Sequence, residues 1–226
     1  ALRMEQMVSK NSEVMDKYDP EKKIALIVDE WGGWYEVEKG TNPAFLHQQN
    51  TMRDAMIAGS TLNIFNNHAD RVKMANLAQT INVLQAVILT RDEKMLLTPT
   101  YHVMEMYNVH HDALQLPLTV KSEDYVLNDK KLQAVSASAS RNKNGVVHIS
   151  LVNIDSRNQK EITIDLNGIH ATTAIGRILR SQNLQDHNTF DQPQKVKPVA
   201  FTDTRMEGKN LKLTLPPFSV VVLELK

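Results

Sequence analysis

The sequence predicts an α/β part followed by an all-β part. From residue 1 to about residue 111, helix-like stretches alternate with short apolar runs, an order typical of parallel strands joined by helical crossovers. After His111, short runs of alternating polarity are separated by turn residues, which is typical of an antiparallel β-sandwich. We therefore predict two domains, residues 1–111 and residues 112–226, with the boundary near residue 112.

The α/β part is expected to open with a helix and to contain two strands. Apolar residues recur at helical spacing until Asp19-Pro20, a pair that ends a helix. The unbroken apolar run 24–28 predicts a strand buried on both faces. Residues 72–78 predict a second strand, parallel to the first because a helix separates them.

Three further helices are predicted in this part. Asn42 caps and Pro43 opens one of them, and its core-facing residues are Phe45, Met52, Met56 and Ile57. Apolar spacing predicts the next helix, marked by Ile81, Leu84, Val87 and Ile88. Thr98-Pro99 starts the last helix, whose inward residues are Val103, Met104 and Tyr107. The all-β part is expected to hold strands at 133–140, 146–152, 161–166, 175–179, 211–215 and 219–225.

Composition limits the classes of partner. Lys plus Arg (26) balance Asp plus Glu (26), so no overall field favours nucleic acid or an anionic membrane. No apolar run approaches the ~18 residues needed to span a bilayer, and the absence of cysteine excludes disulfides and thiolate metal sites. We therefore expect no nucleic-acid and no membrane partner. A cytoplasmic location is favoured, and a secreted or periplasmic one stays open if a signal precedes Ala1.

A candidate catalytic carboxylate lies where the first predicted strand ends. The sequence turns abruptly polar at Asp29 and Glu30 and continues with Trp31-Gly32-Gly33-Trp34. Catalytic groups of a parallel α/β barrel lie at the carboxyl ends of strands, and a carboxylate can attack the anomeric carbon of a sugar. The two glycines would let both indoles line one sugar pocket. The alternative is an acid that caps the next helix, with both tryptophans in the core.

Other polar residues give weaker signals. Structural roles or solvated loops are expected for Asp29, Glu36, Glu38, His68 and Asp70. The serines of 136–140 fit a strand face better than a set of nucleophiles. His110-His111 lacks the spacing of metal ligands, so we expect no metal site. No Gly-x-Gly-x-x-Gly or P-loop motif occurs, so we expect no cofactor.

The segment around Glu30 resembles the nucleophile motif of the family 51 α-L-arabinofuranosidases, which are glycoside hydrolases. The resemblance continues in order through nearly the whole chain, at 40–43, 48–55, 62–65, 68–72, 74–79, 82–86, 98–103, 186–190 and 216–220. A lone Asp-Glu-Trp motif would be weak evidence for the family. This many matching blocks in the same order make the resemblance specific.

This resemblance implies a (β/α)8 TIM barrel followed by a C-terminal antiparallel β-sandwich. The chain would hold the last two βα units, with Glu30 ending the seventh strand and 72–78 forming the eighth. Glu30 would be the nucleophile of a retaining hydrolase that releases terminal α-L-arabinofuranosyl residues from arabinan- or arabinoxylan-type glycans. Trp34 and Gln79 match substrate-binding positions, and homo-oligomers are common in the family.

A retaining mechanism also needs a carboxylic acid about 5–5.5 Å from the nucleophile. The family carries this acid in an Asn-Glu pair, and the 226 residues contain no Asn-Glu dipeptide. We therefore expect a C-terminal fragment that is inactive without the N-terminal remainder of the barrel. Two alternatives stay open: a non-catalytic carbohydrate-binding or structural β-sandwich module, and a hydrolase acting on a different sugar.

Overall fold

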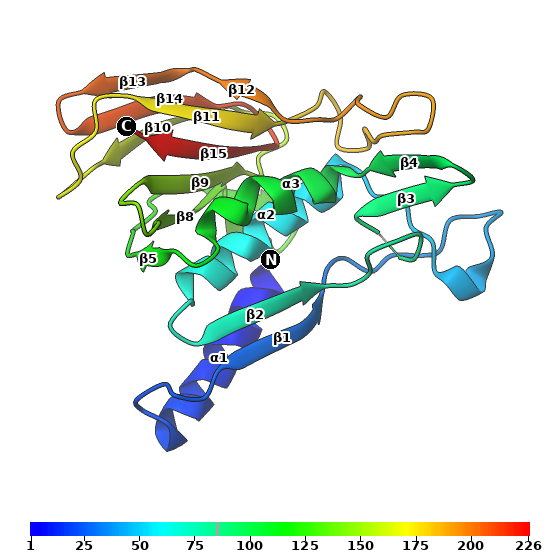
Figure 1. Cartoon of the computed structure of the whole chain (residues 1–226), viewed down its shortest axis with the longest axis horizontal. Helices are drawn as coiled ribbons and strands as arrows, with labels where there is room; N and C mark the ends of the chain where they lie inside the picture. Colours follow the sequence, from blue (N-terminus) through cyan, green and yellow to red (C-terminus); the bar gives the residue numbers. More distant parts are fainter. Residues whose placement is uncertain (85) are drawn as a thin grey trace.

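The fold is a stack of layers, shown by a computed structural model that describes residues 1–84 and 86–226. A three-stranded sheet packs on a six-stranded sheet, two helices cover the other face of the larger sheet, and a pair of strands with one further helix lies beyond them (Figure 1). The chain is mostly β-structure with a few helices. The layers alternate in this way because each sheet has an apolar face that must be covered.

The first half of the chain supplies the helices and the parallel strands. Its elements are α1 (Leu2–Tyr18), β1 (Leu26–Trp31), the 3-10 turn η1 (Pro43–Phe45), α2 (Met52–Asn67), β2 (Val72–Leu77), β3 (Ile88–Arg91), β4 (Lys94–Leu97), α3 (Pro99–Tyr107) and the 3-10 turn η2 (Asn108–His110). β1 and β2 pair in parallel, which confirms the orientation predicted from the intervening helix. No other strand joins this sheet within the described residues.

β1 begins later than predicted and is buried on one face only. Leu26 and Val28 pack against the core, whereas Ile27 is 42% exposed. The prediction of a strand buried on both faces was therefore wrong for this chain. The reason is that α1 and α2 supply apolar partners to one side of the β1–β2 pair, and nothing in the described residues covers the other side.

The predicted helix at Asn42-Pro43 is only a three-residue turn. Asn42 does cap it, because its side chain accepts a hydrogen bond from the Ala44 N–H, and Leu46 then takes a left-handed conformation that stops the helix. Phe45 is 59% exposed, so its predicted place in the core was wrong. The longer helix α2 starts at Met52 behind its own capping box.

The helix predicted at Ile81–Ile88 was also wrong, although residue 85 lies outside the described residues. β3 and β4 form an antiparallel hairpin here. Asn82, Leu84 and Asp92 all have positive φ, which is incompatible with a continuous right-handed helix. The Asn82 side chain instead bonds Thr90 of β3, donating to its Oγ1 and accepting from its N–H, both at 2.8 Å.

The second half forms two antiparallel sheets. The six-stranded sheet has the order β12-β11-β15-β9-β8-β5, and the three-stranded sheet has the order β10-β14-β13. Their strands are β5 (Leu114–Leu116), β8 (Val135–Arg141), β9 (Val147–Asn153), β10 (Lys160–Asp165), β11 (Ala174–Leu179), β12 (Val199–Phe201), β13 (Thr204–Glu207), β14 (Asn210–Leu215) and β15 (Ser219–Leu225). A separate hairpin joins β6 (Asp124–Leu127) and β7 (Lys130–Gln133). All six predicted strands are confirmed.

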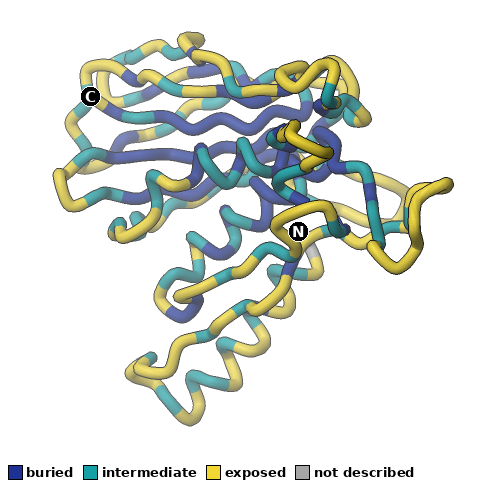
Figure 2. Tube along the Cα trace, turned by 45° about the vertical axis from the view of Figure 1, so that its right-hand side comes forward, coloured by how far each residue is buried: buried dark blue, intermediate teal, exposed yellow. Residues whose placement is uncertain are grey.

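The apolar residues form two clusters, one on each face of the six-stranded sheet. One cluster lies between the two sheets and includes Ala137, Leu151 and Leu213. The other joins helix residues such as Ala55 and Val103 to Val152 and Val220 of the sheet. Burial is concentrated along the sheet and the helices packed on it (Figure 2). The predicted boundary near residue 112 therefore falls between elements that share one core.

A polar layer also joins α2 to the six-stranded sheet. Asn63 donates to Ser136 Oγ at 3.1 Å and accepts from Ser138 Oγ at 2.8 Å, and Asn67 donates to the Ala137 carbonyl at 2.9 Å. On β8 the serines face the helices, whereas Ala137 and Ala139 belong to the core between the sheets. The serine run is thus a strand face, as predicted.

Candidate active site

The parallel pairing of β1 and β2 brings two predicted site residues to one edge. Trp31 pairs with Leu77 at the end of the two strands, so Glu30 lies at the carboxyl end of β1 and Gln79 follows the carboxyl end of β2. Both residues are exposed. Such an edge is where parallel α/β folds carry their reactive groups. Neither residue hydrogen-bonds to the other among the described residues.

The two tryptophans do not line one pocket, contrary to the prediction. Trp31 is 5% exposed, and its ring meets the Phe65 ring edge-on with centroids 5.5 Å apart. Trp34, in the loop after β1, is 64% exposed. Trp31 is therefore a core residue, as the alternative interpretation held, whereas Trp34 is free to meet a ligand.

β1 is irregular at the two neighbouring carboxylates, Asp29 and Glu30. The pairing register shifts between Val28 and Trp31, and Asp29 and Glu30 are both exposed. A regular strand would turn successive side chains to opposite faces, so the irregularity explains why both carboxylates face solvent. Among the described residues, the Asp29 side chain makes no hydrogen bond or ion pair that would support the structural role predicted for it.

The loop that carries Trp34 is held by buried polar residues. The Tyr35 N–H donates to Gln48 Oε1 at 2.6 Å, and the Arg53 guanidinium lies 3.7 Å from the centroid of the Tyr35 ring. Arg53 in turn pairs with Asp54 at 3.1 Å. Burial raises the pKa of the Tyr35 phenol and of the Asp54 carboxyl. Gln48 and Asp54 are almost fully buried, so the loop rests on a fixed support.

These supporting residues were not singled out in the sequence, although they lie in the family-like block 48–55. The available signal was the pattern Thr51-x-x-Asp54, which is a capping box placed just before an apolar run. The contact between Arg53 and Tyr35 joins residues 18 positions apart and had no local signal.

His68 and Asp70, which were expected in structural roles, have structural partners. His68 Nε2 lies 2.8 Å from Glu5 Oε1, and Asp70 is paired with Lys22, which lowers the pKa of the Asp70 carboxyl. Glu38 accepts a hydrogen bond from the Gln49 N–H at 3.3 Å, within the exposed loop predicted for it. Glu36 is exposed.

Neither a metal centre nor a membrane segment is found in the described part of the chain. It holds no group of three or more His, Cys, Asp or Glu side chains able to bind a metal ion. None of its helices has the length and apolar character that crossing a bilayer requires.

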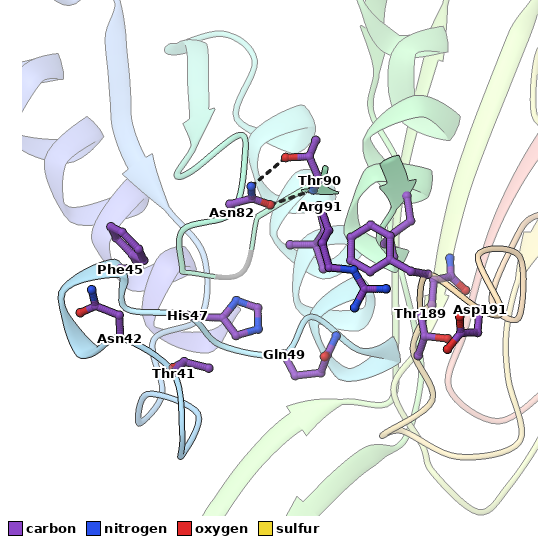
Figure 3. Close-up of a pocket in the computed structure, with 14 residues that line it drawn as sticks. Thr41, Asn42, Phe45, His47, Gln49, Asn82, Thr90, Arg91, Thr189 and Asp191 are labelled. Atoms are coloured by element: carbon purple, nitrogen blue, oxygen red, sulfur yellow. Dashed lines mark hydrogen bonds between the residues drawn. The ribbon is translucent and has the colours of Figure 1, made fainter. Parts of the chain in front are cut away.

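A cavity of about 430 Å³ is linked to the loop that carries Trp34, because its lining residues His47 and Gln49 flank Gln48, which accepts the hydrogen bond from the Tyr35 N–H. It is formed by three segments: the loop around η1, the β3–β4 hairpin with the residues before it, and the loop 188–191 (Figure 3). The first and second of these segments follow β1 and β2 in the chain, although neither Glu30 nor Gln79 lines the cavity.

Comparison with known proteins identifies the family. Residues 29–219 match the model described as "Alpha-L-arabinofuranosidase C-terminal domain". Over its whole length, the chain is 48% identical to the intracellular exo-α-L-arabinofuranosidase of Bacteroides ovatus, and the match covers 44% of that protein.

Solved structures agree with this match. The family 51 arabinofuranosidase of Xanthomonas axonopodis pv. citri superimposes with a TM-score of 0.96 at 46% identity, over 99% of this chain and 45% of that one. A family 51 α-L-arabinofuranosidase of Bifidobacterium longum has the same fold, with a TM-score of 0.84 at 24% identity over 99% of this chain and 47% of that one.

The chain spans less than half the length of these three relatives. The family match covers most of it, including the strand end with Glu30 and the loop with Trp34. The chain therefore belongs to the α-L-arabinofuranosidase C-terminal domain family and corresponds to the C-terminal portion of the glycoside hydrolase family 51 α-L-arabinofuranosidases.

Proposed function

We propose that Glu30 is the catalytic nucleophile of a retaining α-L-arabinofuranosidase. The observation that carries the proposal is the exposed position of Glu30 at the carboxyl end of β1, at the same edge as the end of β2. Family membership supports the substrate class, which is terminal α-L-arabinofuranosyl residues of arabinan- or arabinoxylan-type glycans. Trp34 and Gln79 are proposed to bind the sugar from the loop after β1 and from the end of β2.

In the proposed reaction, a Glu30 carboxylate oxygen attacks the anomeric carbon while the bond to the leaving oxygen breaks. A carboxylic acid outside this chain gives its proton to the leaving oxygen. The same group then takes a proton from water, whose oxygen displaces Glu30 from the covalent arabinosyl-enzyme. Two displacements at one carbon retain the anomeric configuration.

We propose that the N-terminal remainder of a TIM barrel completes this site. The outer face of the β1–β2 pair supports this step, because Ile27 and Met74 are 42% and 54% exposed there. Apolar strand faces and unpaired strand edges need a covering partner. A sheet of two parallel strands is also below the size that is stable by itself.

The proposal is tested in a chimera in which this chain replaces the matching C-terminal part of the Bacteroides ovatus relative. Hydrolysis of an aryl α-L-arabinofuranoside by the chimera should fall by ~10³-fold or more in Glu30→Gln, because removing a nucleophile abolishes the covalent step. Asp29→Asn is the matched control, since Asp29 is the exposed neighbour, and it should stay within about tenfold of the parent.

Azide distinguishes a nucleophile from a residue that only shapes the site. Azide should restore turnover of the aryl substrate in Glu30→Ala and give an arabinosyl azide of inverted configuration, since the small anion enters the vacated space. Unchanged turnover in Glu30→Gln would contradict the proposal. The 226-residue chain by itself is expected to show no turnover, because it lacks the acid that protonates the leaving group.

A further inference from the structure

The cavity between the η1 loop, the β3–β4 hairpin and the loop 188–191 has walls that are fixed to one another. Asn188, which is 3% exposed, accepts from the Val196 N–H at 2.7 Å and donates to the Val196 carbonyl at 2.9 Å. It also donates to the Leu97 carbonyl of β4 at 2.8 Å. This buried amide therefore ties the loop 188–191 to the β3–β4 hairpin, so two of the three walls are pre-formed, as small-molecule sites usually are.

The polar groups that line the cavity suit the hydroxyls of a sugar. Asn82 is held by its two hydrogen bonds to Thr90, which leaves one amide hydrogen and one carbonyl lone pair available. Asn42 uses its carbonyl oxygen for the Ala44 N–H at 3.0 Å, so its amide NH₂ remains a donor. Gln49 donates to the Asn50 carbonyl at 3.1 Å, and its side-chain oxygen remains an acceptor.

An aromatic ring and a cation complete the lining. The Arg91 guanidinium lies 4.4 Å from the centroid of the Phe190 ring, and stacking on a ring holds a guanidinium in place. Arg91 makes no ion pair with a carboxylate among the described residues, so its N–H groups can donate to a ligand. In Figure 3 its side chain extends between the η1 side of the cavity and the loop with Thr189 and Asp191.

The charge in the cavity favours a neutral ligand. Arg91 and Asp191 both line it, and their formal charges cancel. A phosphate or a uronate would be attracted by the positive charge of Arg91 and repelled by the negative charge of Asp191. A hydroxyl can accept from the guanidinium and donate to the carboxylate. The volume of about 430 Å³ lies within the usual range of small-molecule pockets.

We propose that this cavity is a second carbohydrate subsite, which takes a neutral sugar unit of the same glycan next to the arabinosyl unit that is cleaved. This inference rests on the proposed function, because the cavity is linked through Gln48 to the loop with Trp34, which follows the strand edge with Glu30. Asn82 follows Gln79 by three residues, and the η1 segment follows the loop with Trp34. A glycan bound at that edge would extend into the cavity.

The test measures the binding of α-1,5-linked arabinotriose to the 226-residue chain by titration calorimetry and ligand-observed NMR. Arg91→Ala and Phe190→Ala should each weaken binding by about threefold or more, since one lost hydrogen bond or ring contact is worth that much. Met95→Ala is the matched control, because Met95 is exposed on the same hairpin and does not line the cavity. Thermal unfolding verifies that each variant is folded, and Arg91, being exposed, can be removed without disturbing the core.

Trp34→Ala, in the same titrations, separates the two proposals. If both cavity variants bind like the parent while Trp34→Ala binds more weakly, the subsite is overturned and the proposed function stands. If the cavity variants weaken binding while Glu30→Gln leaves turnover of the chimera unchanged, the subsite stands and the proposed function fails. No binding by the folded parent chain, or tighter binding of digalacturonate than of arabinotriose, overturns the neutral-sugar subsite.

Discussion

At the residue scale, His110 is an ionisable group whose surroundings constrain its charge. Its Nδ1 lies 2.7 Å from Ser140 Oγ and its Nε2 lies 2.6 Å from Ser150 Oγ. A neutral imidazole offers one donor and one acceptor, which two hydroxyls can match. Burial is the main cause that lowers the pKa of His110 to about 4, and the charges of the nearby His148 and His111 lower it further.

This pKa predicts that the chain loses stability in mild acid. The folded pKa is below the ordinary value of 6.5, so the unfolded chain binds the proton first. The contribution of neutral His110 to the free energy of unfolding is fully present above pH 6.5 and is lost as the pH falls toward 4. Between pH 7.5 and pH 5 the free energy of unfolding should fall by about 2 kcal/mol. Urea unfolding at the two pH values measures it.

His110→Gln is the matched variant for the acid effect. Its amide can still donate and accept, but it does not titrate. The variant should show a smaller loss of unfolding free energy between pH 7.5 and pH 5. Some loss should remain, because burial also lowers the pKa of His102 and His148. Equal losses in parent and variant would show that His110 is not the source.

At the element scale, α2 packs against the six-stranded sheet formed by the second half of the chain. The N-terminus of α2 is capped by side chains. Thr51 Oγ1 accepts from the Arg53 N–H at 3.2 Å, and Asp54 Oδ2 accepts from the Thr51 N–H at 2.8 Å. Thr51→Ala should lower the free energy of unfolding by about 1 kcal/mol, with a range of about 0.5–2. Thr51→Ser keeps the hydroxyl and should lose less, as measured by urea unfolding. Equal losses in the two variants would contradict a capping role.

The elements also show which parts of the fold could be predicted from the sequence. Six of the nine strands of the two antiparallel sheets were predicted, because alternating polarity and turn residues are local signals. The shorter strands β5, β12 and β13 were missed. The β3–β4 hairpin was not, because its apolar residues have helical spacing and Asn82 and Leu84 take positive φ without being glycine. Phe45 was likewise misplaced, since a left-handed Leu46 ends the turn that precedes α2.

For the candidate site, sequence indicated the strand end but not the directions of its side chains. Glu30 and Gln79 were expected at one edge because both follow predicted parallel strands. The register shift after Val28, which leaves Glu30 exposed and turns Trp31 into the core, depends on the pairing with β2. A single sequence holds no local trace of such a pairing, so the two tryptophans could not be distinguished.

At the scale of the whole molecule, both faces of the six-stranded sheet are covered, and this bears on the alternative of an independent binding module. Val152, Val220 and Val222 are buried in the cluster that includes residues of α2 and α3. A chain cut to residues 112–226 would expose these side chains to water. The exposure of each would cost about 1.5–3 kcal/mol of stability. We predict a lower unfolding temperature and increased binding of an apolar dye compared with the full chain.

The fragment also tests the module directly. If residues 112–226 keep the unfolding temperature of the full chain and bind arabinan or arabinoxylan tightly in calorimetry, the sandwich is an independent carbohydrate module. Loss of stability on cutting at residue 112 would indicate that the sheets and the helices fold as one body.

Trapping the covalent intermediate shows directly whether Glu30 is the nucleophile. The chimera is incubated with a 2-fluoro-substituted arabinofuranoside that carries a good leaving group, which slows the second displacement more than the first. Mass spectrometry of the digested protein should find one sugar attached to the peptide that contains Glu30, and no sugar in Glu30→Gln. A sugar attached to Asp29 or to a residue outside this segment, or its persistence in Glu30→Gln, would contradict the assignment of Glu30 as the nucleophile.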